Sequence, residues 1–202
     1  MSDLLIVFAK NPQHSPVKTR IANHHGPQRA RQIYDKLLDI TFDWLPHCRA
    51  DVVLYTDALP FPHPGSHVHP TRLQRGDDLG QRMRNALLEC SQSHSRCVLI
   101  GVDCPYLHAP LVDEAFQHLY ETPVVIGPST DGGYYLIGVQ SHCAPLKELF
   151  EGMPWGTSDV LDLTLRRLKD LSIKPHLLPT LSDIDTWDDW QQYLRYHALQ
   201  KN

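Results

Sequence analysis

The feature that most restricts the fold of this chain is a series of short apolar runs, each followed at once by a polar or glycine-bearing segment. Leu4–Ala9, Asp51–Thr56 and Cys97–Val102 are typical of strands buried on both faces, because a strand with one wet face would alternate apolar and polar residues. Helical spacing over Pro27–Leu45 indicates a helix that returns the chain to the sheet. The pattern predicts a three-layer α/β/α sandwich with a mixed, mostly parallel sheet.

The remaining elements continue this alternation. Further strands are expected at Val124–Ile126 and Tyr134–Val139, and the tight turn at residues 131–133 permits the second of them to run antiparallel. Four prolines in Pro60–Pro70 predict an exposed irregular loop. Helices are expected after Gly80, over Leu111–Tyr120, after a cap at Thr157, Ser158 or Asp159, and from Asp185 or Thr186 to about His197.

Size, charge and cysteine content exclude several classes of protein. The chain has 202 residues, 42% of them hydrophobic, which fits a single domain over residues 1–202. Nineteen Lys and Arg against 23 Asp and Glu give a net charge of −4, which disfavours a binder of nucleic acid or of anionic membranes. Leu4–Ala9 is far shorter than the ~20 residues of a membrane span. Five scattered cysteines without a Cys-x-x-Cys motif predict a reducing, cytoplasmic location.

The segment after the first predicted strand is basic. Lys10, Lys18 and Arg20 lie within eleven residues, and their side chains suit phosphate oxygens through charge-assisted hydrogen bonds. The segment has neither a Walker A pattern nor Gly-x-Gly-x-x-Gly, so phosphate binding would rest on side chains rather than on a glycine-opened backbone. The alternative interpretation is a solvated basic loop.

Residues 73–83 place two glycines, which permit close approach of a ligand to the backbone, next to a helix N-terminus. Gln74 is a candidate for contact with the edge of a nucleotide base. The alternative is a glycine turn before an ordinary helix capped by Asp77 or Asp78.

Acidic residues at two predicted loop positions suggest a cation site. Asp103 follows a buried strand and suits a hard divalent ion that also touches phosphates, and Asp185 is a candidate second ligand. Capping and turn hydrogen bonds are the alternative for both. Cys104 has no placed histidine partner, so a buried thiol is favoured over a nucleophile. The histidine pairs at 24–25 and 67/69 lack a third ligand at a familiar spacing, which favours exposed side chains.

Residues 127–135 and 153–158 supply groups for a sugar or an acceptor. The glycine pair Gly132 and Gly133 lets the backbone pass close to a ligand while Asp131 presents a carboxylate. Trp155 and Thr157 add an aromatic face and a hydroxyl before a helix. A plain hairpin turn and helix capping are the alternatives for these two segments.

Taken in order, six of these segments resemble one family. They are residues 8–12, 17–20, 76–80, 101–105, 127–134 and 183–186. The chain resembles the bacterial branch of GT-A-fold nucleotide-diphospho-sugar transferases, which includes radical-SAM and selenodomain-associated transferases. It is similar, more distantly, to molybdenum-cofactor and phospholactate guanylyltransferases. The resemblance implies a nucleotide under the first loop and a cation, Mg²⁺ or Mn²⁺, near Asp103.

The resemblance also implies roles for individual residues. It places nucleotide contacts at Ala9, Lys10, Lys18, Arg20, Gln74, Gly76 and Arg82, and sugar or acceptor contacts at Gly132, Gly133, Tyr134, Trp155 and Thr157. Two departures from the family pattern bear on catalysis. His14 and Ser15 replace the usual Pro-Gly, and Asp103 stands alone where many GT-A enzymes have Asp-x-Asp, so Asp185, water or ligand oxygens would complete the cation shell.

These observations predict a metal-dependent transferase that passes a glycosyl group from a nucleotide-diphospho-sugar to a small acceptor. Lys18 and Arg20 would stabilise the leaving diphosphate, and Asp131 would orient or deprotonate the acceptor hydroxyl. One alternative is a guanylyltransferase-like nucleotidylyltransferase that releases pyrophosphate. Another is a nucleotide-binding module without catalysis, and a homodimer is compatible with each of them.

Overall fold

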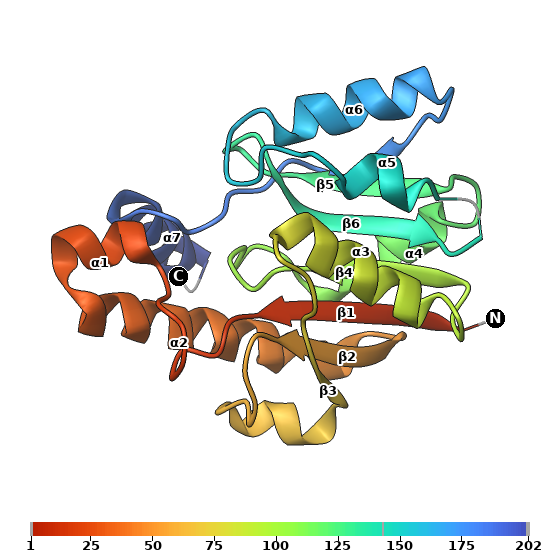
Figure 1. The fold of residues 1–202 in the computed structure, drawn as a ribbon. Coiled ribbons are helices and arrows are strands. Elements are labelled where there is room, and N and C mark those ends of the chain that lie inside the picture. The colour runs from red at the N-terminus through yellow and green to blue at the C-terminus, as the bar shows by residue number, and fades with distance from the viewer. Residues whose placement is uncertain (1, 143, 201–202) are drawn as a thin grey trace.

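A computed structural model describes residues 2–142 and 144–200 of the chain. Within them, a single seven-stranded sheet has the order β3-β2-β1-β4-β6-β5-β7 (Figure 1). The strands are β1 Asp3–Ala9, β2 Asp51–Thr56, β3 Thr71–Leu73, β4 Arg96–Ile100, β5 Val124–Pro128, β6 Tyr134–Gln140 and β7 His176–Leu177. The helices are α1 Thr19–His25, α2 Pro27–Trp44, α3 Leu79–Cys90, α4 Ala109–His118, α5 Leu146–Phe150, α6 Val160–Asp170 and α7 Trp187–Gln200, with 3-10 turns η1 Leu45–His47 and η2 Pro64–Val68.

The sheet is mixed and mostly parallel, as the sequence predicts. β1 runs parallel to β2 and β4, β2 to β3, and β5 to β7. β6 is antiparallel to both β4 and β5, so the expected reversal is confirmed. Gly132 makes this reversal at φ +89°, a conformation that glycine adopts without steric cost, and a Cβ there would meet the backbone of Ser158.

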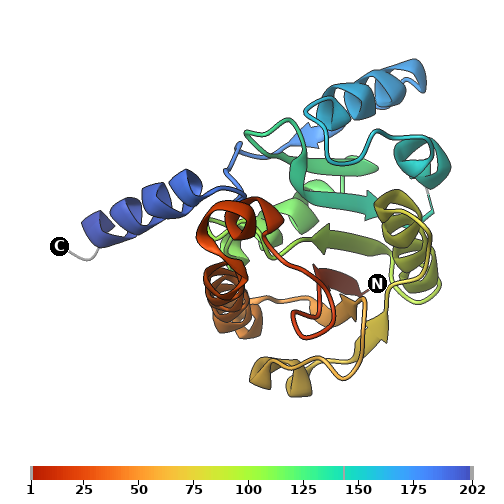
Figure 2. The same cartoon turned by 60° about the vertical axis from the view of Figure 1, so that its left-hand side comes forward.

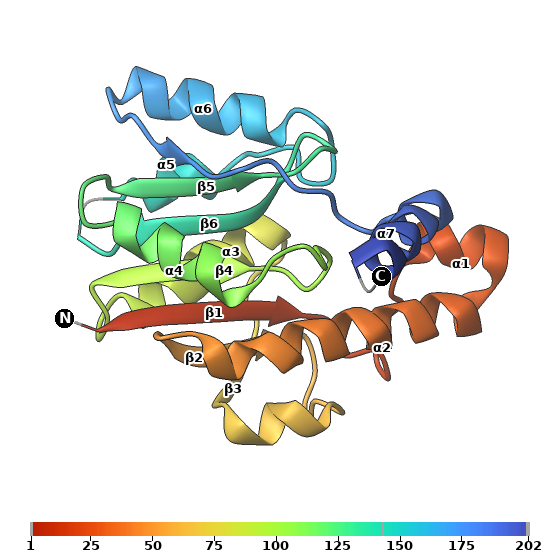
Figure 3. The ribbon, with the colours of Figure 1, turned by 180° about the vertical axis from the view of Figure 1, so that it is seen from behind.

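Helices cover both faces of the sheet. Leu5 and Val7 pack into an apolar cluster with α2 and α4, whereas Ile6 and Phe8 pack into a second cluster with α3, α5 and α6. Figures 1 and 3 show these two helical layers from opposite sides. Because successive side chains of β1 enter different cores, every position from Leu4 to Ala9 is apolar. This explains the unbroken run at residues 4–9.

α1 and α7 lie beyond the carboxyl ends of the central strands (Figure 1). Ile21 of α1 and Tyr193 of α7 pack with Ile33 and Leu37 of α2 in a third, smaller apolar cluster. Figure 2 shows the rest of α7 extending away from the sheet. In the described residues, no helix combines the length and the apolar character needed to cross a bilayer.

The structure differs from the sequence-based prediction in several details, among them the bounds of α4, which spans Ala109–His118 and not Leu111–Tyr120. The basic segment, expected to be a loop up to Arg20, already enters α1 at Thr19. The Pro60–Pro70 segment contains the turn η2 and is not fully exposed, since Phe61 and Ser66 are 5% and 6% exposed. The last helix begins at Trp187, after the two residues expected to open it. The sequence-based prediction contains no helix at α1, because this helix has a single fully buried residue and so lacks the apolar stripe that periodicity detects.

Candidate functional site

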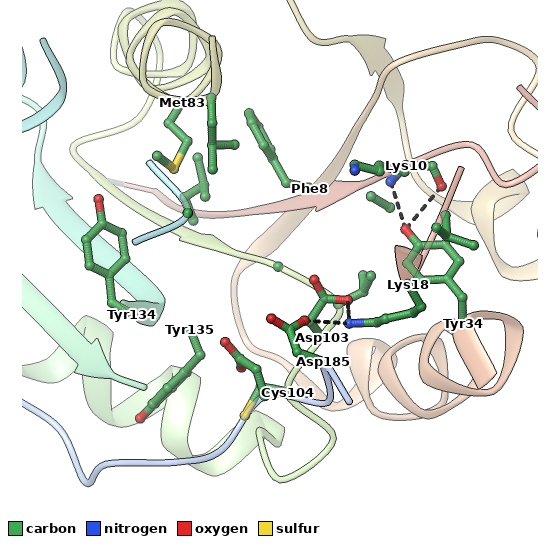
Figure 4. Close-up of a pocket in the computed structure, with 18 of the residues that line it drawn as sticks. Phe8, Lys10, Lys18, Tyr34, Met83, Asp103, Cys104, Tyr134, Tyr135 and Asp185 are labelled. Atoms are coloured by element: carbon green, nitrogen blue, oxygen red, sulfur yellow. Dashed lines mark hydrogen bonds and ion pairs between the residues drawn. The ribbon is translucent and has the colours of Figure 1, made fainter. Parts of the chain in front are cut away.

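A cavity of about 670 Å³ opens at the carboxyl ends of β1 and β4, where open α/β sheets place their ligands (Figure 4). It contains many of the sequence-predicted residues. Those that line it are Ala9, Lys10, Lys18, Arg20, Gln74, Arg82, Asp103, Tyr134 and Asp185. Four separate loops therefore contribute to one site.

Lys18 occupies the centre of this site. Its side chain is only 4% exposed, and its Nζ lies 2.6 Å from Asp103 Oδ1 and 3.4 Å from Asp185 Oδ1 (Figure 4). Lys18 has φ 47° immediately before α1, and this left-handed conformation turns the chain into the helix. Arg20, from the first turn of α1, places Nη1 3.1 Å from Asp185 Oδ2. The two expected cation ligands thus share one ammonium group.

The ammonium group of Lys18 is charged. Burial alone would lower the pKa of Lys18, but the carboxylates of Asp103 and Asp185 outweigh burial and raise that pKa above its ordinary value. The sequence predicted contacts of Lys18 with phosphate. In the structure, Lys18 instead neutralises the carboxylates expected to hold a metal ion.

Asp183 adds a third carboxylate to the cavity. Ser129 Oγ donates a hydrogen bond of 3.1 Å to Asp183 Oδ2, while the other oxygen, Oδ1, is buried and has no hydrogen-bond partner among the described residues. Burial, followed by the charges of Asp103 and Asp131, raises the pKa of Asp183 to about 7. Removing a proton from Asp183 therefore adds charge to a site that already holds two acids.

We expect Asp183→Asn to change how stability depends on pH. The pKa of Asp183 rises from 3.8 to about 7 on folding, so the native state binds more protons in this interval and wild-type stability falls as pH rises through it. The variant cannot titrate here and should exceed wild type by more than about 1 kcal/mol at pH 8. Urea denaturation from pH 5 to 8.5 in EDTA measures this, and a stability difference that is constant with pH would contradict it.

Asn11 holds the basic loop after β1 in place. The residue is completely buried, and its Nδ2 donates to the carbonyl oxygens of Ala58 at 3.0 Å and Pro60 at 2.8 Å. Its Oδ1 accepts from the backbone N–H of Gln13 at 3.0 Å, and its own N–H donates to Asp57 Oδ1 at 2.6 Å. One amide side chain therefore ties the loop to the segment after β2, in place of a glycine-rich backbone.

Asn11→Ala should destabilise the protein by about 2–3 kcal/mol, because it leaves buried backbone groups without partners. Loss of this anchor also frees Lys10, so ligand affinity at the cavity should fall together with stability. Urea denaturation and ligand titration measure the two effects, with Asn23→Ala on the exposed face of α1 as the matched control. Equal stability of the two variants would refute this role for Asn11.

Tyr34 is a second support that the sequence interpretation missed. Its hydroxyl accepts from the N–H of Lys10 at 2.8 Å and donates to the carbonyl oxygen of the same residue at 3.1 Å (Figure 4). The sequence does contain a sign of this contact. Tyr34 lies within the apolar stripe of α2, and a buried tyrosine hydroxyl needs a polar partner.

The segment before α3 serves both as a helix cap and as a wall of the cavity. Asp78 Oδ1 accepts from the N–H of Gln81 at 2.8 Å, which confirms Asp78 as the cap. Gln74 Nε2 donates to the carbonyl oxygen of Tyr55 at 3.1 Å, and Arg82 Nε donates to that of Gly76 at 3.0 Å. Gln74 and Arg82 line the cavity, but Gly76 does not.

The proposed sugar and acceptor residues are only partly gathered at the cavity. Tyr134 lines it and carries a buried hydroxyl with no hydrogen-bond partner among the described residues. Trp155 packs edge-on against Tyr134, with ring centroids 6.3 Å apart, and stacks on Phe150. Five residues predicted for this role or for catalysis do not line the cavity. They are Asp131, Gly132, Gly133, Trp155 and Thr157.

Two of these residues form hydrogen bonds within their own turns. Asp131 is exposed, and its Oδ1 accepts from the N–H of Gly133 at 2.9 Å in the turn before β6. Thr157 Oγ1 donates to the carbonyl oxygen of Pro154 at 2.8 Å.

Cys104 does line the cavity, but burial raises the pKa of its thiol far above the ordinary value, so the thiol stays protonated.

The composition of the cavity determines the chemistry that it can support. Cationic side chains from the β1 loop and α3 suit phosphate oxygens, and the carboxylates that share Lys18 suit a divalent cation. The apolar wall, which includes Phe8, Met83 and Leu99, suits a flat or hydrophobic ligand group.

Comparison with known proteins identifies solved structures with a similar fold. A solved structure from Desulfovibrio desulfuricans G20, provisionally named a nucleotide-diphospho-sugar transferase, is 30% identical, with a TM-score of 0.83 over 92% of this chain and 84% of that one. CMP:2-keto-3-deoxy-manno-octonic acid synthetase complexed with CTP is 11% identical, with a TM-score of 0.61 over 100% of both chains. Rv0371C in complex with manganese, from Mycobacterium tuberculosis H37Rv, is 14% identical, with a TM-score of 0.53 over 96% of this chain and 99% of that one. Among curated proteins, none matches.

A sequence-family profile accounts for more than half of the chain. It is described as "Uncharacterized protein conserved in bacteria (DUF2064)" and matches residues 47–157, a range that includes Gln74, Arg82 and Asp103. Together with the 30% identity over most of both chains, this shows that the protein belongs to the DUF2064 family, a bacterial family of nucleotide-diphospho-sugar transferase-like fold.

Proposed function

We propose that this protein is a divalent-metal-dependent transferase that binds a nucleotide-diphospho-sugar in the cavity and passes its glycosyl group to a small acceptor. The observation that carries the proposal is the arrangement around Lys18, in which Asp103 and Asp185 share one cationic group inside a cavity bordered by further cations. The negative charge of a diphosphate would pair with the cationic side chains, and the positive charge of its metal ion would pair with the carboxylates.

The residues present fit a hard divalent cation such as Mg²⁺ or Mn²⁺. Carboxylate oxygens are the preferred ligands of these ions, and the Lys18 ammonium already stands where Asp103 and Asp185 can share one cation. The unpartnered Oδ1 of Asp183 adds a further acceptor. When bound, the ion would supply neutralisation of the charge that develops on the leaving diphosphate.

The side chains of this chain then have distinct tasks. Lys10, Arg20 and Arg82 hold phosphate oxygens, and Lys18 would pair with the diphosphate oxygens if a metal ion neutralised Asp103 and Asp185. The acceptor oxygen forms a bond to the sugar carbon as the bond from that carbon to the diphosphate oxygen breaks. The acceptor proton passes to Asp131, an exposed carboxylate in the turn before β6 that lies outside the cavity lining and would act on an acceptor bound at its mouth.

Nucleotidyl transfer is the second candidate, because the CTP-bound synthetase shares the fold over the whole chain. In that reaction, an acceptor phosphate or hydroxyl oxygen attacks the α-phosphorus of a nucleoside triphosphate and pyrophosphate leaves. The same cations suit a triphosphate, so product analysis distinguishes the two reactions.

A thermal-shift panel tests the proposal. Nucleotide sugars, nucleoside diphosphates and nucleoside triphosphates are each added with Mg²⁺, with Mn²⁺ or with EDTA, since a ligand of the native state raises its melting temperature. We expect the largest shift with one nucleotide sugar plus metal, followed by release of the nucleoside diphosphate in an acceptor screen. A preference for one triphosphate with pyrophosphate release would establish the second candidate instead, and binding without turnover would indicate a non-catalytic module.

A further inference from the structure

A cluster of metal-binding side chains lies away from the cavity, where the last turn of α4 meets β7. Glu114 and His118 are four residues apart on α4 and so share one face of the helix, and His176 opens β7. Each offers one ligand atom, and the three atoms lie within 4.8 Å of one another. In the described residues, no other group of three or more His, Cys, Asp or Glu side chains meets this condition.

Topology separates this cluster from the cavity. His176 pairs with Val125 near the start of β5, and β5 runs in the same direction as β4 because both are antiparallel to β6. The cluster therefore lies at the amino end of the strands, whereas the cavity lies at the carboxyl ends of β1 and β4. A metal ion at the cluster would not be the ion proposed for catalysis.

The two histidines are already in contact. Their rings stack with centroids 3.3 Å apart, and His118 Nε2 lies 3.9 Å from Glu114 Oε1. In a tetrahedral site, two donor atoms that each lie about 2.1 Å from a zinc ion are about 3.4 Å apart, so donor atoms at the observed limit of 4.8 Å would have to approach each other by about 1.4 Å. We expect side-chain rotation to turn the stacked rings toward a common point when the ion binds.

The electrostatic environment also suits a cation. His176, whose ring stacks on that of His118, lies beside the carboxylate of Glu114. The charges of Glu114 and Glu121 act on the same ring, and His118 lies in the last turn of α4, where the helix dipole favours positive charge.

We infer that Glu114, His118 and His176 form a binding site for a borderline transition-metal ion, Zn²⁺ being the expected occupant. Imidazole nitrogen with one carboxylate suits zinc, whereas Mg²⁺ and Mn²⁺ prefer oxygen ligands alone. The ion would link α4 to β7, a two-residue edge strand whose chain continues to Asp183. Its main effect is therefore on the stability of this edge.

Zinc titration of the metal-stripped full-length protein tests the inference. We expect calorimetry to show one equivalent of tightly bound Zn²⁺, and zinc to raise the melting temperature. His118→Gln and His176→Gln each remove one ligand and should weaken binding by at least about tenfold and abolish the thermal shift. Both side chains are partly exposed, so the variants should fold, which circular dichroism verifies.

Two further variants make the result specific. His67→Gln alters an exposed histidine of another histidine pair and should leave zinc affinity unchanged. Asp103→Asn alters the cavity and should also leave it unchanged, whatever happens to nucleotide binding. The inference is overturned by a wild-type protein that binds no zinc, by full zinc affinity in His118→Gln, or by loss of zinc binding in Asp103→Asn or His67→Gln.

Discussion

Asp103→Asn should abolish metal-dependent nucleotide binding while leaving the fold intact. Asn keeps the size of the side chain and can place its carbonyl oxygen close to Lys18, whose Nζ forms an ion pair of 2.6 Å with Asp103 Oδ1. The negative charge that attracts a divalent ion is lost, however. Changes that only disturb the support of metal ligands cost about 10–100-fold in metal affinity, so loss of a direct ligand should exceed about 100-fold.

Calorimetric titration of a nucleotide with and without Mn²⁺ measures this effect. Asp162→Asn, an exposed acid on α6 that does not line the cavity, is the matched control and should bind as wild type does. Unchanged Mn²⁺-dependent binding in Asp103→Asn would remove this residue from the proposed metal site and direct attention to Asp183 and Asp185.

The fold and the general position of the site are predictable from local sequence patterns. A strand buried on both faces has an unbroken apolar run, and the side chain that follows it must lie at the end of the sheet. This rule places Asp103 and the basic β1 loop at one edge of the sheet. The reversal at Gly132 was likewise predictable, because the glycine pair next to a strand signals a tight turn.

The partners within the site were not predictable in this way. The bonds from Asn11 to Ala58 and Pro60 connect residues 47 and 49 positions apart, and no periodicity encodes them. The sequence predicts a role for Lys18 in phosphate binding, but its pairing with Asp185 spans 167 positions. The histidine cluster shows the same limit: Glu114 and His118 have a recognisable helical spacing, yet His176 reaches them only through the pairing of β7 with β5.

Lys18→Met should produce two opposite effects on ligand binding. The methionine side chain fills similar space but removes the ammonium that Asp103 and Asp185 share. Nucleotide affinity should fall by about 10–100-fold, the range for loss of one charged hydrogen bond. Mn²⁺ alone should bind more tightly than to wild type, because the carboxylates no longer have an internal cation that the metal ion must displace.

The free energy of unfolding, measured with and without Mn²⁺, distinguishes loss of the shared ammonium from general damage to the fold. Without metal, Lys18→Met should lose about 1–3 kcal/mol, less than for a fully buried pair because Asp103 and Asp185 are 47% and 38% exposed. Mn²⁺ should restore this loss, whereas Lys147→Met on the exposed face of α5 should neither lose stability nor gain affinity for Mn²⁺. Equal Mn²⁺ affinity in wild type and Lys18→Met would show that Lys18 and the metal ion do not compete for these carboxylates. The proposed exchange of Lys18 between carboxylates and diphosphate would then be wrong.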